Sequence, residues 1–153
     1  MRRALDTLNA LLALGIVAYA TWAWPRLPER IPAHFGPDGL PDRWTETSLF
    51  SWFLLPAIGL ATWALVVGLR SWMVRRPQHM NLPSGQKLTE FPADVRPAIV
   101  EHMRAFMALV GFEVLVIFGL ILVGSHRTAM GGDGQGLMLA VLAIAVLSGP
   151  VLL

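Results

Sequence analysis

The sequence predicts an all-α integral membrane protein with four transmembrane helices and an ordered extracytoplasmic loop between the first two. Its 153 residues are 55% hydrophobic and 14% charged, whereas soluble domains carry about 25% charged residues. Four apolar runs are long enough to cross a bilayer, which needs roughly 20 helical residues. The one formally charged side chain within these runs is Glu113. Because lipid offers no hydrogen-bond partners, such runs must satisfy their own backbone groups as helices.

The four predicted spans are residues 7–24, 49–69, 105–123 and 136–153. The first follows Arg2 and Arg3, and Ala18-Tyr19-Ala20 also suits the cleavage site of a signal peptide. The apolar stretch nevertheless continues through Trp22 and Trp24, and tryptophan is typical of a membrane interface. We therefore expect a retained helix.

The distribution of basic residues predicts the orientation. Eight Arg and Lys residues lie in the N-terminal tail and residues 70–104, against four in residues 25–48 and 124–135. Cytoplasmic segments carry the excess of basic residues. Both chain ends and residues 70–104 are therefore predicted to be cytoplasmic, with the other two connections outside. Three cations are expected at anionic lipid headgroups: Arg70, Arg75 and Arg76.

The long cytoplasmic connection has two notable features. A helix is expected to begin near Val95, capped by Asp94 with Pro97 in its first turn, and to continue into the third span. Upstream, the segment 81–85 reads Asn-Leu-Pro-Ser-Gly and is either a turn or a binding surface for a cytoplasmic protein. Asn81 and Pro83 are the candidate binding residues of that segment.

The outer connection, residues 25–48, is predicted to be a compact, turn-rich loop. Frequent proline prevents a regular helix between Pro25 and Pro41. Within it, Pro37-Asp38-Gly39 is a turn signal, because proline fixes one central φ angle and Gly closes the turn.

Three side chains of this loop could bind a metal ion. His34, Asp38 and Asp42 offer one imidazole and two carboxylates, a set that suits zinc or another divalent ion. In the alternative interpretation Asp38 makes the turn, Asp42 pairs with Arg43 or caps a turn, and His34 packs under Trp44. Two residues of the second outer connection could complete a metal site: His126 and Asp133.

Glu113 is expected to face the interior of the bundle, because an ionised carboxylate near the middle of a span costs at least about 2.5 kcal/mol. It either bonds neighbouring helices together or couples transport to an ion. Its candidate hydrogen-bond partners are Asn9, Tyr19, Thr62 and Ser148. Small residues four apart indicate close helix packing, within a bundle or an oligomer: Ala57 and Ala61, Ala64 and Gly68, Gly136 and Ala140, Ala145 and Gly149.

Several chemistries are excluded or unsupported. With no cysteine, the chain has no disulfide, thiolate metal site or cysteine nucleophile. A formal net charge of +2 does not provide a nucleic-acid-binding surface. The sequence has no phosphate-binding glycine loop, His-Glu-x-x-His pair or nucleophile elbow, and no cofactor is evident.

The outer loop contains a recognisable pattern, I-P-x-H-F followed by G-x-P-D-x-W, over residues 31–44. It resembles a domain of unknown function of prokaryotic membrane proteins, which includes the SdpI-type immunity proteins. A second shared feature is Met80-Asn81-Leu82-Pro83, and the resemblance extends over about residues 27–113. SdpI-type proteins usually carry further helices after this domain. The resemblance implies a bacterial or archaeal cytoplasmic membrane and binding residues in the outer loop: His34, Phe35, Asp38, Gly39, Asp42 and Trp44.

Three functions are compatible with these features. The first is a non-enzymatic membrane protein that binds a protein or peptide at its outer loop, as in immunity, signalling or an accessory subunit. Its expected partners are the lipid bilayer together with another membrane protein, a peptide or a second copy of the chain. The second is a small transport or ion-coupled protein that uses Glu113. The third is a metal-dependent membrane enzyme built on His34, Asp38 and Asp42.

Overall fold

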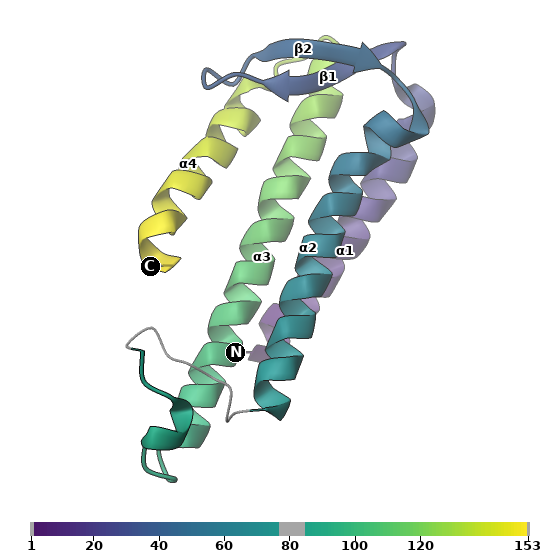
Figure 1. The fold of residues 1–153 in the computed structure, drawn as a ribbon. Helices are drawn as coiled ribbons and strands as arrows, with labels where there is room; N and C mark the ends of the chain where they lie inside the picture. The colour runs from purple at the N-terminus through teal and green to yellow at the C-terminus, as the bar shows by residue number, and fades with distance from the viewer. Residues whose placement is uncertain (1, 77–84, 153) are drawn as a thin grey trace.

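The computed structural model describes residues 2–76 and 85–152, most of which are helical. In Figure 1 the long helices lie side by side, a further helix diverges from them, and a β-hairpin crosses one end. The elements are α1 (Arg2–Ala23), β1 (Arg30–Phe35), β2 (Pro41–Glu46), α2 (Leu49–Arg75), α3 (Arg96–Ala129) and α4 (Gln135–Leu152), with short 3-10 turns η1 (Trp24–Arg26) and η3 (Leu88–Glu90).

The described residues of all four predicted spans are helical. Within the described residues three helices are long and apolar enough to cross a membrane: Ala4–Arg26, Leu49–Arg75 and Arg96–Ala129. The fourth is a shorter apolar helix, whose apolar stretch is Gln135–Ser148. Each long helix extends beyond its predicted apolar run, because polar residues continue the hydrogen-bonded turns at its ends.

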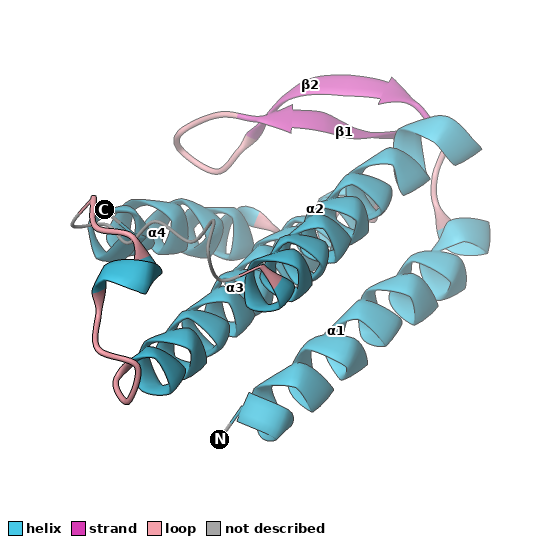
Figure 2. Ribbon diagram, turned by 60° about the horizontal axis from the view of Figure 1, so that its bottom comes forward, coloured by secondary structure: helices cyan, strands magenta, loops and turns pink. Residues whose placement is uncertain are grey.

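Helix α3 is the centre of the molecule. It packs against α1 and α2 on one side and α4 on the other, and β1 also contacts it. Leu115 and Leu122 of α3 are almost completely buried, and Ile16 of α1, Trp52 of α2 and Ile31 of β1 pack in the same core. Helix α4 diverges from α3 toward the C-terminus (Figures 1 and 2). The helices are therefore organised around α3.

Residues 25–48, predicted to be a turn-rich loop, contain the two antiparallel strands β1 and β2. The fold is therefore not all-α as predicted. Cross-strand partners include Ile31 with Thr45 and Pro32 with Trp44, and the register shifts on either side of His34. In a two-stranded sheet each strand has a free edge, so a proline can direct its ring nitrogen away from the partner strand. The prolines therefore exclude a helix but permit a hairpin.

The starts of α2 and α3 differ in their caps. Ser48 and Ser51 form a reciprocal capping box at the start of α2, which satisfies N–H groups that lack helical partners. Helix α3 starts next to the predicted position, with Pro97 in its first turn, but its N-cap is Val95 without a side-chain hydrogen bond. The prediction that Asp94 caps this helix is therefore wrong.

Close helix packing occurs at other glycines than those predicted from spacing. A Cβ on Gly59 of α2 would lie 2.5 Å from Cγ of Phe118 on α3, and one on Gly124 would collide with Met138 of α4. In contrast, Gly68 and Gly136 have open space where a Cβ would be. Spacing identifies small residues, but it does not tell which of them face a neighbouring helix.

Candidate functional site

The tip of the hairpin is a well-formed turn, as predicted for residues 37–39. The N–H of Gly39 donates to the carbonyl of Gly36 at 2.9 Å, and the N–H of Gly36 donates to the carbonyl of Leu40 at 2.8 Å. Asp38 accepts the N–H of Leu40 through Oδ1 at 3.1 Å. Gly39 has a φ of 77°, a conformation that glycine adopts without strain. The turn followed by a left-handed residue is a common three-residue hairpin connection.

The tip is also attached to the start of α4. Nε2 of Gln135 donates to the carbonyl oxygen of Asp38 at 3.0 Å. Gly39 lies so close to α4 that a Cβ there would be 3.0 Å from the carbonyl oxygen of Gln135 and 3.2 Å from Cγ of Leu139. The positive φ angle and the close approach of α4 therefore both favour glycine at position 39.

The base of the hairpin is closed by hydrogen bonds between its two ends, and it is anchored to the start of α2, where the Ser51 hydroxyl donates to the carbonyl of Glu46 at 2.9 Å. Thr47 donates its N–H to the carbonyl of Glu29 at 2.8 Å and its hydroxyl to the carbonyl of Pro28 at 2.6 Å. Ile31 is 3% exposed and belongs to the core. Because the hairpin is held at both ends, it is a rigid platform over the helix ends.

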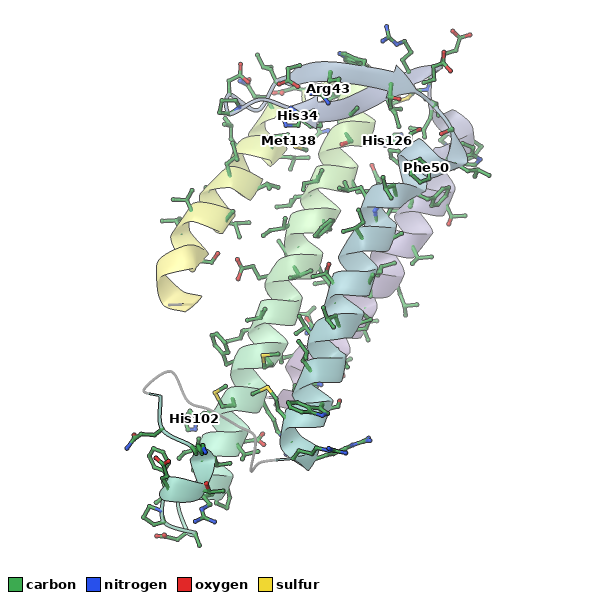
Figure 3. All side chains as sticks on the ribbon, viewed as in Figure 1. His34, Arg43, Phe50, His102, His126 and Met138 are labelled. Carbon is green, nitrogen blue, oxygen red and sulfur yellow. The ribbon has the colours of Figure 1, made fainter. Side chains whose placement is uncertain are left out.

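His34 and Asp42 are brought together on this platform. His34 Nδ1 and Asp42 Oδ1 lie 2.7 Å apart in a hydrogen bond, and the two side chains are 58% and 54% exposed. Asp42 thus pairs with His34 rather than with Arg43, which is the cross-strand neighbour of His34. Figure 3 shows His34 and Arg43 on the hairpin. Trp44 faces Pro32 instead of covering His34, and it is 38% exposed.

The predicted metal ligands do not form one cluster. Asp38 uses its carboxylate in the turn, and the described residues contain no group of three His, Asp or Glu side chains able to hold a metal ion. Of the two residues predicted to complete such a site, Asp133 accepts the N–H of Gln135, and His126 is buried and bonded to Tyr19. His126 thus lies in the last turns of α3, which continues to Ala129, and not in a loop as predicted.

A cavity of about 350 Å³ lies beside the hairpin, between β1, α2 and α3. Its apolar walls include Phe35 of β1, Phe50 and Ile58 of α2, and Ile121 of α3, while Ser51 and Ser125 contribute hydroxyl groups. Phe50 stands at the start of α2 with 74% of its surface exposed (Figure 3).

A second cavity, of about 250 Å³, lies between β1, α3 and α4. His34 and Phe35 line it from the hairpin, and Met138 and Leu142 line it from α4. Phe35 and Ile121 border both cavities. Of the six predicted binding residues of the outer loop, two therefore line these cavities, His34 and Phe35.

An aromatic cluster around His126 lies under the hairpin and was not predicted from the sequence. The Tyr19 hydroxyl and His126 Nδ1 are 2.7 Å apart in a hydrogen bond. The rings of Tyr19, Trp22 and Trp52 stand edge-on to the imidazole, with centroids 5.6, 5.8 and 6.2 Å away. His126 is 8% exposed, and its buried Nε2 has no hydrogen-bond partner among the described residues. The cluster ties α1, α2 and α3 together; its sequence signal is the interfacial tryptophans.

Glu113 lies half-buried on α3, and its four predicted partners are hydrogen-bonded elsewhere. Asn9 donates to the carbonyl of Ala108 at 2.9 Å, which links α1 to α3, and Tyr19 bonds to His126. The other two bond to carbonyls within their own helices: Thr62 to Ile58 and Ser148 to Ile144. The cytoplasmic candidates Asn81 and Pro83 lie outside the described residues.

Comparison with known proteins gives two matches of unknown function. Residues 11–60 match the family model described as "Domain of unknown function (DUF1648)", a segment that includes most of α1, the hairpin and the start of α2. An uncharacterized protein of the archaeon Archaeoglobus fulgidus is 34% identical over 127 residues, which are 76% of this chain and 64% of that protein. The chain therefore spans somewhat less than two thirds of that relative. No solved structure matches.

Proposed function

We propose that the protein is a non-enzymatic member of this domain family in a prokaryotic cytoplasmic membrane, and that it binds a protein or peptide with its hairpin on the extracytoplasmic side. The observation that carries the proposal is the cavity of about 350 Å³ beside the hairpin, with Phe50 exposed at its rim. An SdpI-like role in immunity or signalling is one form of this activity.

The surface around this cavity suits an extended peptide with apolar side chains. Phe50, at the start of α2 and next to β1, is 74% exposed. The neighbouring β1 has a free edge, and extended peptides can pair with such edges while their side chains enter pockets. Because the hairpin is fixed at its tip and base, it loses little conformational entropy when a peptide binds. A small entropy loss favours high affinity.

The orientation can be tested in the cysteine-free chain. A cysteine replacing Arg43, which is exposed on β2, is expected to react with a membrane-impermeant maleimide in intact cells. A cysteine replacing Thr89, which is exposed in η3, should react after the cells are permeabilised. The reverse labelling pattern would refute the extracytoplasmic position of the hairpin.

Binding can be tested by photo-crosslinking in native membranes, with mass spectrometry to identify the adduct. A photoreactive residue at position 50 is expected to give a discrete peptide or protein adduct that disappears when Phe35 is replaced by Asp. The same residue at position 65, which is 61% exposed on α2 but distant from the hairpin, serves as the control. Identical adducts from both positions, or none at position 50, would contradict the proposal.

A further inference from the structure

A third cavity, of about 330 Å³, lies at the end of the helices opposite the hairpin. Its lining residues are Asp6 of α1, Arg70, Ser71, Val74 and Arg75 of α2, and Arg104 of α3. Three guanidinium groups from two helices therefore converge on one hollow. The predicted headgroup contacts of Arg70 and Arg75 did not include Arg104, which is distant from them in the chain.

Nearby carboxylates position two of these arginines without neutralising all three. Asp6 Oδ1 accepts from Nη1 of Arg70 at 2.5 Å, and Glu101 Oε2 accepts from Nη1 of Arg104 at 3.4 Å. The side chains of Arg70 and Arg104 are 19% and 30% exposed. A guanidinium carries five N–H donors, so these contacts leave donors that can reach a ligand in the cavity. Among the described side chains that line the cavity, three arginines face one carboxylate, that of Asp6, so the lining carries a net positive charge.

The cavity lies at the depth expected for lipid headgroups. The part of α2 from Leu49, beside the hairpin, to Arg70 is about 32 Å long at roughly 1.5 Å per residue. A bilayer has a hydrocarbon core of about 30 Å. When the hairpin lies at one interface, Arg70 and its neighbours therefore lie at the other. Trp72, which is 48% exposed, is a residue type enriched at this level.

We propose that this cavity is a binding site for the phosphate group of an anionic phospholipid. Arginine recognises phosphate through paired N–H donors, and the Ser71 hydroxyl provides a further donor. A zwitterionic headgroup would bring its own cation into a pocket that is already positive, so the site prefers a headgroup without one. The inference rests on the membrane location proposed above and is independent of what the hairpin binds.

Lipid retention by the full chain in detergent, measured by native mass spectrometry, tests the site. For equal retention by the wild-type protein, the concentration of phosphatidylglycerol is expected to be at least about tenfold lower than that of phosphatidylcholine. The double variant Arg75→Gln/Arg104→Gln keeps the Asp6–Arg70 pair and should lose this preference. The variant Arg76→Gln/Lys87→Gln removes the same charge outside the cavity and should retain it. The single variant Arg75→Gln, at an exposed position, provides a further test when the double variant does not fold. It should weaken the preference for phosphatidylglycerol.

Three results would overturn the assignment. The first is equal retention of both lipids by the wild type, and the second is an unchanged preference in folded variants lacking Arg75 or Arg104. The third is protection from thermal unfolding by inorganic phosphate in the absence of lipid, which would identify a soluble phosphate as the ligand. Flotation with phosphatidylcholine vesicles separates this inference from its premise. A chain that floats but shows no lipid preference refutes the phosphate site, whereas a chain that does not float refutes the membrane location.

Discussion

His34 and Gly39, only a few residues apart, have opposite structural roles in the hairpin. His34 is 58% exposed and bonds to one equally exposed partner, Asp42. Gly39 is buried against α4, in a backbone conformation that other residues adopt at a cost. Stability therefore depends on Gly39, while His34 is available to a ligand.

Replacing Gly39 by Val should destabilise the protein by about 2–3 kcal/mol, because a β-branched residue is strained at positive φ and its Cβ would press on Gln135. Thermal unfolding in detergent, followed by circular dichroism, measures the effect. Gly131→Val is the matched control, since Gly131 has a φ of 76° but nothing within 4 Å of a Cβ. Equal losses in the two variants would show that contact with α4 contributes nothing.

Replacing His34 by Gln should change the free energy of unfolding by no more than about 0.5 kcal/mol, because exposed pairs contribute little to stability. The crosslinked adduct at position 50 should nevertheless weaken, because His34 adjoins Phe35, which lines both the cavity of His34 and that of Phe50. Unfolding of the His34→Gln variant under the same conditions would instead assign His34 a structural role.

At the level of the elements, the sequence predicted the helices more accurately than the hairpin. Apolar length determines a span in lipid, and this signal does not require knowledge of the neighbours. The strands lack clean alternation, because the register shifts beside His34 and prolines occupy both strands. The turn at residues 37–39 was predictable because its signal is local. Likewise, the contacts of Gly59 and Gly124 depend on neighbouring helices, which residue spacing alone does not identify.

The contact between α2 and α3 gives a prediction with opposite signs at two glycines. Gly59→Ala should destabilise the protein, because its Cβ would lie 2.5 Å from Cγ of Phe118. Gly68→Ala, in open space on the same helix, should be neutral or stabilising by up to about 1 kcal/mol, since Ala favours helix more than Gly does. Thermal unfolding of both variants checks the difference. A stabilising Gly59→Ala would show that α2 and α3 are not closely packed there.

For the whole molecule, the candidate site could be predicted only in part. The outer-loop pattern gave the residues of the hairpin, but not the cavities beside it, which need β1, α2, α3 and α4 together. The cluster at His126 combines side chains from three helices, and composition cannot show such a convergence. The choice between peptide binding and ion coupling likewise depends on Glu113, whose predicted partners are bonded elsewhere.

Glu113→Gln distinguishes these two functions. If the protein acts by binding at the hairpin, the variant should preserve the crosslinked adduct and stability within about 1 kcal/mol, because Gln keeps the polar shape of Glu. Proton flux into vesicles containing the wild-type or variant chain provides the second measurement. A flux present in the wild type and abolished by Gln would favour the ion-coupled alternative.

The central position of α3 has a consequence for biosynthesis. Helix α1 leaves the ribosome first, yet it packs more extensively against α3 than against α2. Its Asn9 amide donates to a carbonyl of α3, and its Tyr19 bonds to the His126 side chain near the end of α3. Neither polar group can make its bond until the ribosome has made α3. A chain ending after α2 would leave both groups without these partners.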